Sequence, residues 1–437
     1  MEQYAQMKSS GVSWIQDVPN DWGIRVLFQL VDQVKNKNRD LVEQNLLSLS
    51  YGKIKRKDIN NPEGLLPESF DGYNIIEADD IVLRLTDLQN DHTSLRVGQA
   101  KERGIITSAY ITIRPSTMVN PQYLYYVLHA YDLIKGFYGM GSGVRQGLNY
   151  DEVKAIKTPF PSLIIQDAIV TYLNEQVEQI DSIIEEAKNS IEKYKKWKDA
   201  TVFEAVTKGL DPNAEMKDSG NLFIGTIPKT WKCVKIARVL EKSKDGIRVG
   251  PFGSSLTNAV VSASEGDVKI YGQANLIRKD FNYGDKYVTQ ETYDRLREYE
   301  VRSGDVAVSM MGTIGKCCVV PDGIDLGIMD SHLIKIRLDG SILPKYFEYV
   351  YESYAVFEQL RNLSKGSIMS GLNSTIVKSA FVTLPSIKEQ KAIVRYLDEK
   401  CEKMDSIIFE REALVEDMEK YKRSLIYETV TGKRKVV

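Results

Sequence analysis

One segment of the sequence occurs twice, as PSLIIQDAIVTYLNEQVEQIDSII at Pro161–Ile184 and as PSIKEQKAIVRYLDEKCEKMDSII at Pro385–Ile408. Both copies belong to a longer repeat: residues 147–207 align with residues 371–431 without a gap, and 26 of 61 positions are identical. In each copy a proline precedes a long helical pattern, which is typical of a helix start. The chain therefore contains one long helix in each half.

Apolar side chains recur along both copies in alternating steps of three and four residues, the spacing of a coiled-coil seam. The seam positions are 173, 177, 180, 184, 187, 191 and 194 in the first copy and 397, 401, 404, 408, 411, 415 and 418 in the second. Position 411 is an arginine and is unexpected there. A helix cannot bury a one-sided stripe alone, so the sequence predicts that Gln166–Lys208 pairs with Gln390–Thr431. The alternative is that each helix packs inside its own domain.

The repeat extends upstream of the helices in shorter blocks. Residues 10–22 match residues 219–231, and residues 114–127 match residues 337–350, whereas the segments between these blocks differ. MKSSG near the N-terminus resembles MKDSG at Met216–Gly220. The repeat is therefore cyclic, like a two-unit ring that has been opened at a linker, and it predicts a pseudo-twofold molecule.

Short β-type runs with turn residues fill the rest of each half, and an aromatic-rich helix is expected at residues 121–134 and 344–357. The tyrosines of these helices lie at helical spacing and are predicted to be core residues. We expect an α+β fold with two pseudo-twofold-related β-rich recognition domains joined by two long helices. The expected boundaries are 1–160 and 216–385 for the β-rich domains and 161–215 and 386–437 for the helical regions.

Composition narrows the class of protein. The net charge of −2 argues against a protein that coats nucleic acid indiscriminately, but allows a specific binder with its positive charge on one face. The four cysteines form no CxxC pattern and fit a reducing cytoplasm, and the three histidines are isolated, so no metal site is expected. No secretory signal and no apolar run of the ~18 residues that a membrane span needs are visible.

Catalytic motifs are missing from the sequence. Gly315-Lys316 is followed by cysteine and lacks the first glycine of a phosphate-binding loop, and no GxGxxG follows a predicted strand. No methyltransferase loop of the N/D-P-P-Y/W type occurs, and no motif places a histidine for a nucleophile triad. We therefore expect a recognition protein that is not an enzyme and that binds no cofactor itself.

Loops rich in Gly, Ser, Gln, Asn, Arg and Lys occur at equivalent places in both halves. These side chains suit DNA: Arg and Lys bind guanine edges, Asn and Gln bind adenine, and glycine lets the backbone approach phosphates. The candidate DNA-binding residues of the first half are Lys53, Lys55, Arg84, Arg145 and Gln146. Those of the second half are Arg248, Ser254, Gln273, Asn275, Lys316, Lys365 and Ser367.

The duplicated order of motifs resembles the DNA specificity subunit of type I restriction–modification systems. The resemblance covers essentially the whole chain. It is carried by I/V-P-x-x-W at Val18–Trp22 and Ile227–Trp231, GPFGSSL at Gly250–Leu256, GLN at 147–149 and 371–373, and PS…QxAIVxYL at Pro161–Leu173 and Pro385–Leu397.

This resemblance implies two target recognition domains, each of which binds one half of a split site in double-stranded DNA. It implies that the two long helices form an antiparallel coiled coil that sets the spacing between half-sites. Two modification subunits, which bind S-adenosylmethionine and methylate adenine, are the implied partners, together with ATP- and Mg-dependent restriction subunits. A cytoplasmic location follows, without membrane contact.

Two alternatives remain open from the sequence. The chain could be a stand-alone DNA methyltransferase or nuclease, against which the missing motifs argue. It could also be a coiled-coil scaffold that presents two domains to proteins rather than to DNA, because clusters of basic residues are ambiguous.

Overall fold

A computed structural model describes residues 4–59, 69–91, 93–140, 147–256, 259–263, 266–312, 315–364 and 371–436. The chain forms two compact units, the first made of Met1–Lys188 with Glu412–Val437 and the second of Asn189–Arg411. The division falls inside both long helices, α3 (Leu163–Lys208) and α10 (Ile387–Val430). The end of α10 thus belongs to the unit that contains the N-terminal domain, an arrangement that matches the cyclic order of the repeat.

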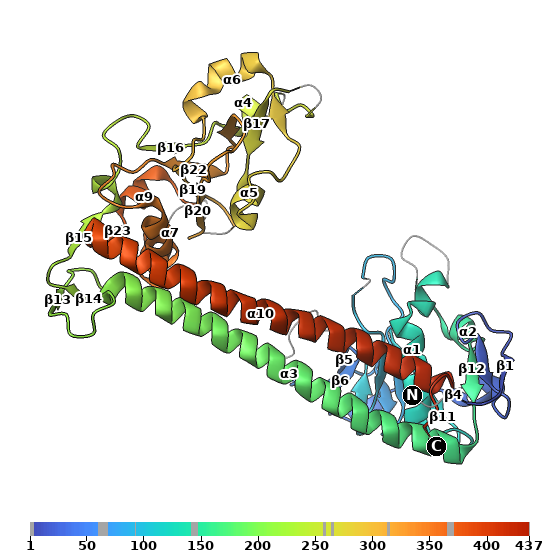
Figure 1. Ribbon diagram of the computed structural model, residues 1–437. Coiled ribbons are helices and arrows are strands. Elements are labelled where there is room, and N and C mark those ends of the chain that lie inside the picture. The colour runs from blue at the N-terminus through green and yellow to red at the C-terminus, as the bar shows by residue number, and fades with distance from the viewer. Residues whose placement is uncertain are drawn as a thin grey trace. The chain divides into compact units, whose positions relative to one another are not determined.

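In each unit a segment of α3 lies beside a segment of α10 (Figure 1). In the first unit, Lys422 Nζ lies 2.6 Å from Asp181 Oδ1 and Lys188 Nζ lies 3.3 Å from Glu419 Oε1. Residue numbers therefore rise along one helix as they fall along the other, so the segments are antiparallel. In the second unit, Lys198 Nζ contacts Asp405 at 2.6 Å. The predicted helix pairing is confirmed in both units.

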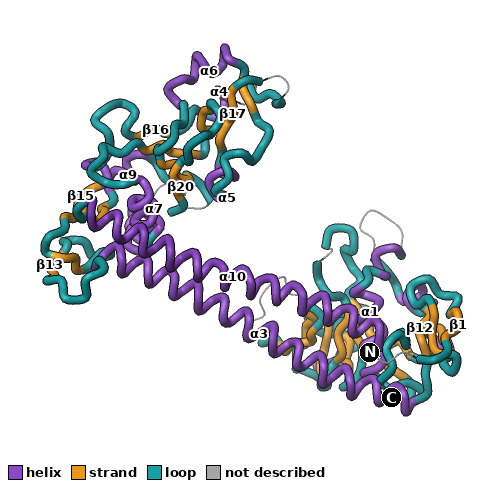
Figure 2. The backbone as a smooth tube through the Cα atoms, viewed as in Figure 1, coloured by secondary structure: helices purple, strands orange, loops and turns teal. Residues whose placement is uncertain are grey.

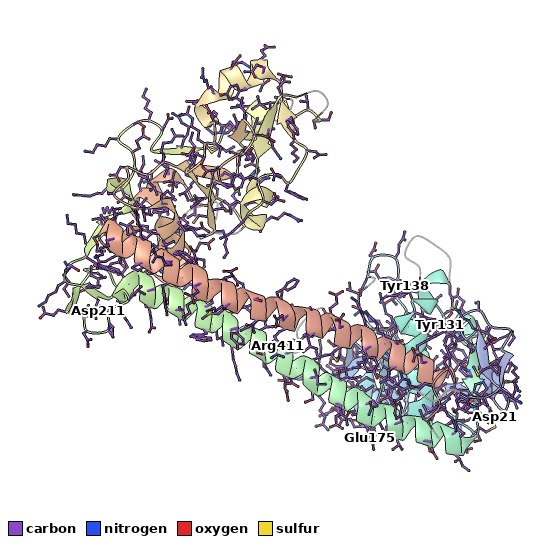
Figure 3. All side chains as sticks on the ribbon, viewed as in Figure 1. Asp21, Tyr131, Tyr138, Glu175, Asp211 and Arg411 are labelled. Carbon is purple, nitrogen blue, oxygen red and sulfur yellow. The ribbon has the colours of Figure 1, made fainter. Side chains whose placement is uncertain are left out.

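The apolar stripe is buried as the spacing predicts, with one exception. Positions 173, 180, 184, 187, 191, 397, 401, 404 and 408 are at most 9% exposed, and positions 177, 194, 415 and 418 are half-buried. Arg411 is exposed (labelled in Figure 3), so its assignment to the seam is wrong. A guanidinium keeps its water shell where no partner compensates for desolvation.

Each unit contains the same four-stranded antiparallel sheet. In the first unit the order is β4-β11-β8-β9, formed by Val31–Gln33, Ile111–Pro115, Ile81–Leu83 and Val97–Gln99. In the second unit the order is β16-β22-β19-β20, formed by Ile247–Val249, Leu333–Ile336, Val306–Ser309 and Cys317–Val319. Two-stranded pairs also recur: β1-β2 (Met7–Ser9, Asp17–Pro19) and β3-β12 (Gly23–Val26, Lys157–Phe160) correspond to β13-β14 (Met216–Asp218, Thr226–Pro228) and β15-β23 (Lys232–Lys235, Phe381–Leu384).

The remaining strands and short helices differ between the units. The first unit adds β5-β6 (Leu47–Ser50, Lys53–Arg56) and β7-β10 (Asn74–Ile76, Gly104–Ile106). The second adds β17, β18 and β21 (Val268–Tyr271, Tyr287–Val288, Gly327–Met329), of which β17 and β21 are parallel, and the helices α4 (Gly253–Leu256), α5 (Gln273–Arg278) and α6 (Gln290–Leu296). The strands are short, and loops make up much of each unit (Figure 2).

The aromatic-rich helices pack behind the sheets. α1 (Pro121–Leu133) is continuous, but the second copy is broken into α7 (Pro344–Glu352) and α8 (Tyr354–Ser364). The single helix predicted at 344–357 is therefore wrong: Ser353 has an extended backbone (φ −65°, ψ 154°), and its Oγ donates to Val350 O at 2.6 Å. A serine hydroxyl that bonds nearby backbone competes with the helical pattern. Tyr123 and Tyr346 are buried, as predicted for core residues.

A buried glutamine joins each long helix to the aromatic helix of its unit. Gln166 Oε1 accepts from Asn120 N at 2.8 Å, and its Nε2 donates to Pro161 O at 2.8 Å. In the second unit Gln390 Oε1 accepts from Leu343 N at 2.7 Å, and its Nε2 donates to two carbonyls. Both glutamines are fully buried. The repeat therefore preserves individual hydrogen bonds as well as element order.

The same holds for an ion pair in each sheet. Arg114 on β11 forms a bidentate bridge to Asp80, with both N–O distances 2.7 Å. Arg337 forms the equivalent bridge to Asp305 at 2.8 and 2.9 Å. Both aspartates are at most 2% exposed, so each carboxylate loses its water but gains two charge-assisted hydrogen bonds.

Within the described part of the chain, no helix combines the length and apolarity that crossing a bilayer requires. The same residues contain no group of three or more His, Cys, Asp or Glu side chains that could hold a metal ion.

Candidate nucleic-acid interface

In each unit a loop joins two neighbouring strands of the four-stranded sheet: β8 to β9 in the first unit and β19 to β20 in the second. We call residues 84–91, after β8, the first hairpin loop, and residues 309–312, at the end of β19, the second hairpin loop. Leu148 N donates to Leu85 O at 2.9 Å in the first unit, and Leu372 N donates to Met310 O at 2.9 Å in the second. The leucine of each GLN motif therefore holds a hairpin loop by its backbone.

The asparagine of each motif starts the next helix. Asn149 Oδ1 accepts from the backbone of α2 (Tyr150–Val153), at 2.8 Å from Asp151 N. Asn373 Oδ1 accepts from Ile376 N at 2.9 Å in α9 (Ser374–Ser379). These are N-caps, which satisfy amides that have no partner inside the helix. GLN thus belongs to the frame that positions the loops.

The first hairpin loop presents polar side chains. Thr86, Gln89 and Asn90 are exposed, whereas Leu88 is buried and holds the loop to the core. Arg84 is half-buried, and its guanidinium has no partner among the residues that the structure describes. Asn90 Nδ2 already donates to Asp87 Oδ1 at 2.7 Å inside the loop. The loop therefore combines an uncommitted cation with the Gln89 amide, whose donor and acceptor match those of base edges.

A basic hairpin lies in the same unit. Lys53 and Lys55 are exposed on β6, beside a tight turn at Tyr51-Gly52 in which both residues have positive φ (47° and 75°). Two such residues are typical of the turns that join twisted strands. Tyr51 is 74% exposed at the tip. Neither predicted lysine forms an ion pair with a residue that the structure describes, and both are placed to meet an anionic partner.

Three predicted residues of the second unit, Arg248, Gln273 and Asn275, are bonded to other groups of the protein. Arg248 contacts Glu298 Oε2 at 2.5 Å and Asp245 Oδ1 at 3.5 Å, so its charge is already balanced within the protein. Gln273 donates to Ser309 Oγ at 2.5 Å and to Met311 O, and thereby holds the second hairpin loop.

Asn275 is 5% exposed, and its amide is used within its own loop. Its Oδ1 accepts from Gly272 N at 2.9 Å, and its Nδ2 donates to Asp280 O at 3.1 Å and Tyr283 O at 2.7 Å. The side chain has no group left for a base edge, so Asn275 shapes the loop and does not present a contact.

Lys316 is exposed and lines a cavity of about 1270 Å³ inside the second unit, between the paired helices and the aromatic helix. Other lysines of this cavity are paired with acids, as in Lys198–Asp405 and Lys345–Glu348. The mixed charge does not form a strongly positive groove.

Other predicted residues lie outside the described part of the chain. These are Arg145, Gln146, Lys365 and Ser367, together with the side chain of Ser254.

Buried titratable groups lie behind the first hairpin loop, on α1. Burial raises the pKa of Asp132 to about 6, against the opposing hydrogen bond from the Arg96 backbone. Burial lowers the pKa of His129 to about 4, with help from Lys422 and against Asp181. The carboxyl and the imidazole each favour the neutral form, because charge is costly away from water.

Sequence reasoning did not single out Arg96, which contacts the first hairpin loop. It is fully buried beneath the first hairpin loop, and its guanidinium donates to the loop backbone. A single arginine ahead of a short strand carries no motif, so only its burial in three dimensions identifies it.

Comparisons with known proteins agree with this arrangement. A family model described as the type I restriction modification DNA specificity domain matches residues 228–414. A protein of Methanocaldococcus jannaschii named as the putative type I restriction enzyme MjaX specificity subunit is 22% identical over 434 residues, covering 97% of this chain and 96% of its own length. The type I restriction enzyme MjaVIII specificity subunit of the same organism is 20% identical over 426 residues, covering 96% and 94%.

A solved structure, from work on complex assembly and conformational transition of the type I R-M system, shares the fold. Its TM-score is 0.66 at 14% sequence identity, and the match covers 94% of this chain and 98% of that chain. These comparisons give no support to the two alternatives raised from the sequence, a stand-alone methyltransferase or nuclease and a protein-binding scaffold. With its duplicated frame and paired helices, the chain is similar along nearly its whole length to DNA specificity subunits of type I restriction–modification systems.

Proposed function

We propose that this specificity subunit binds double-stranded DNA at a two-part target and that each unit contacts one part. One observation carries the proposal: the same backbone hydrogen bond, from Leu148 or Leu372, holds a hairpin loop at the same place in each frame, while the loops themselves differ. A duplicated frame with different loops suits the recognition of two different half-sites.

The exposed groups of the two loops differ in chemistry. The first loop offers the amide of Gln89, which matches the donor and acceptor pair of adenine, whereas Asn90 Nδ2 is bonded to Asp87 Oδ1. The second offers Met311, which is 45% exposed and apolar, and which suits contact with a thymine methyl group. Lys53 and Lys55 suit phosphate contacts, which position a protein without specifying sequence.

We further propose that the subunit acts with two modification subunits, which bind S-adenosylmethionine and methylate adenine, and with restriction subunits that use ATP and Mg. The relatives named as specificity subunits of type I restriction enzymes support this division of labour. The chain would then supply recognition in the cytoplasm and leave the chemistry to its partners.

The test is selection from a randomised duplex library with the complex of this subunit and its modification subunits. The expected product has two specified blocks separated by unspecified base pairs. Arg84→Ala is expected to cost ~1–3 kcal/mol and to relax one block only. A library without any preferred sequence would refute DNA recognition, and relaxation of both blocks would refute independent units.

A salt titration separates phosphate contacts from base contacts. The double variant Lys53→Ala, Lys55→Ala is expected to weaken binding to all sequences alike and to reduce the slope of log affinity against log salt by ~2, since each phosphate contact contributes about 0.9. An unchanged slope would remove the basic hairpin from the interface.

A further inference from the structure

A charged side chain without exposure to water lies beneath the first hairpin loop. The Arg96 guanidinium donates from Nη1 to Thr86 O at 3.0 Å and to Arg84 O at 3.5 Å, and from Nη2 to Asp91 O. Its Nε donates to Tyr138 Oη at 3.2 Å. One side chain thus binds carbonyls at the start, middle and end of the loop.

The remaining contacts tie Arg96 to the frame. Its backbone N donates to Asp132 Oδ2 on α1 at 2.6 Å. Tyr138 (labelled in Figure 3) lies just after α1, and its hydroxyl also donates to Asp91 O at 3.1 Å. The loop is therefore fastened through Arg96 and Tyr138 to the aromatic helix of the unit.

The charge of Arg96 is balanced from the loop itself. Asp91 Oδ2 lies 3.5 Å from Nη2, and hydrogen bonds from Ser94 hold the pKa of Asp91 well below its usual range. Asp91 therefore stays ionised. The same carboxylate accepts from Thr93 N at 3.2 Å and Ser94 N at 2.9 Å, which fixes the end of the loop.

Burying an arginine is costly unless its hydrogen bonds are satisfied, and an apolar side chain of similar volume often stabilises a protein as well or better. Stability alone therefore gives little reason for a guanidinium here. The guanidinium instead fixes the conformation of the loop backbone, because its rigid, planar donors hold several carbonyls in one arrangement.

The second unit holds its loop by different means. The carbonyl of Arg96 accepts from the backbone N of Arg84, the first residue of the first loop, and the carbonyl of Lys316 accepts in the same way from Ser309 N in the second. Lys316 is therefore the position equivalent to Arg96, and its side chain is exposed. There the loop is held by Gln273, whose amide donates to Ser309 Oγ and Met311 O. The two loops thus depend on different residues, so one can be perturbed without the other.

We propose that Arg96 is a positioning residue for DNA recognition by the first unit. It touches no DNA, because it is fully buried. It sets the backbone conformation in which Arg84 and Gln89 meet the bases of one half-site. The proposal rests on the function proposed above and goes beyond it, since it assigns specificity to a residue outside the interface.

The experiment compares Arg96→Met, which keeps the volume but loses every donor, with Arg96→Lys, which keeps the charge and part of the donor set. The matched control is Arg114→Met, which breaks the buried ion pair with Asp80 in the same unit but does not contact the loop. Each variant is assembled with the modification subunits, and base preference in both half-sites is measured by library selection well below the melting temperature.

Arg96→Met is expected to reduce discrimination in one half-site about tenfold or more and to leave the other half-site unchanged. Arg96→Lys should keep an intermediate preference at the same base pairs, and Arg114→Met should lower the melting temperature without changing any preference.

Unchanged preferences in Arg96→Met, or equal changes in both half-sites, would overturn the proposal. If Arg96→Met does not fold, Arg96→Lys decides: wild-type preference in a folded Arg96→Lys protein overturns the proposal, and a selective loss in one half-site supports it. If the wild-type complex itself selects no sequence, the proposed function fails, and this outcome is distinct from a wild-type preference that Arg96 does not influence.

Discussion

The glutamine that joins α10 to α7 provides a quantitative test of the frame. Gln390→Leu keeps a similar volume but removes three hydrogen bonds: those to Leu343 N at 2.7 Å, Ser341 O at 3.0 Å and Pro385 O at 3.0 Å. Each buried polar group that loses its partner costs ~1–3 kcal/mol. Ser341 is exposed and can bond water instead, so the Leu343 amide and the Pro385 carbonyl set the cost. We expect the second unit to lose about 3 kcal/mol.

Hydrogen exchange followed by mass spectrometry is the appropriate assay, because two units need not unfold together and one global transition would not separate them. The amide of Leu343 is the donor in the lost bond, so the start of α7 should exchange ~100-fold faster, given a factor of ten per 1.4 kcal/mol. The peptides of the first unit serve as an internal reference.

The repeat supplies the matched variants. Gln166→Leu removes two equivalent bonds and should accelerate exchange at the start of α1, while leaving the second unit unchanged. Gln179→Leu, at an exposed position of α3, should change stability by less than ~0.5 kcal/mol. Wild-type exchange at the start of α7 in Gln390→Leu would refute the reasoning and would mean that packing alone holds the aromatic helix.

Two further predictions concern the pH dependence of the first unit and the backbone packing of the second. The folded-state pKa of His129, about 4, lies below its ordinary value of 6.5, so the stability it contributes is complete above pH 6.5 and is lost as pH falls towards 4. His129→Leu removes this loss, so the melting temperature of the variant relative to wild type should rise as the pH falls from 6.5 to 4.5 in scanning calorimetry. Asp132, whose pKa is raised to about 6, has the opposite pH dependence but is present in both proteins. Parallel melting profiles of the two proteins would contradict the assignment to His129. Gly250→Ala would place Cβ 1.8 Å from Asp330 O, a backbone atom, and should destabilise the second unit by ~1–3 kcal/mol or more. Gly72→Ala, which meets no atom within 4 Å, should be nearly neutral by thermal melting, and equal effects of the two substitutions would show that the close approach is not maintained in solution.

The repeat made the frame predictable from sequence. Periodicity alone identified α3 and α10 and the buried seam, because a one-sided apolar stripe has few ways to leave water. The cyclic order of the repeat was visible in the sequence, and the units divide so that the end of α10 lies with the N-terminal domain. The tyrosine stripes were assigned to the core for the same reason. These features depend on spacing along the chain, which the sequence states directly.

What depends on three-dimensional neighbours was not predictable. Arg411 occupies a seam position by count but stays in water, because burial of its charge would need a partner that the spacing does not reveal. Asn275 has the right chemistry for adenine, yet folding directs its amide to three backbone groups of its own loop. Arg96 carries no motif, and its role depends on carbonyls of Arg84 and Thr86 that meet its guanidinium only across the sheet. Periodic spacing was enough to define the frame, because an apolar stripe is a pattern along the chain. The folded structure was needed to show which polar side chains face a partner and which are bonded inside the protein, because hydrogen bonds between distant residues leave no periodic signal.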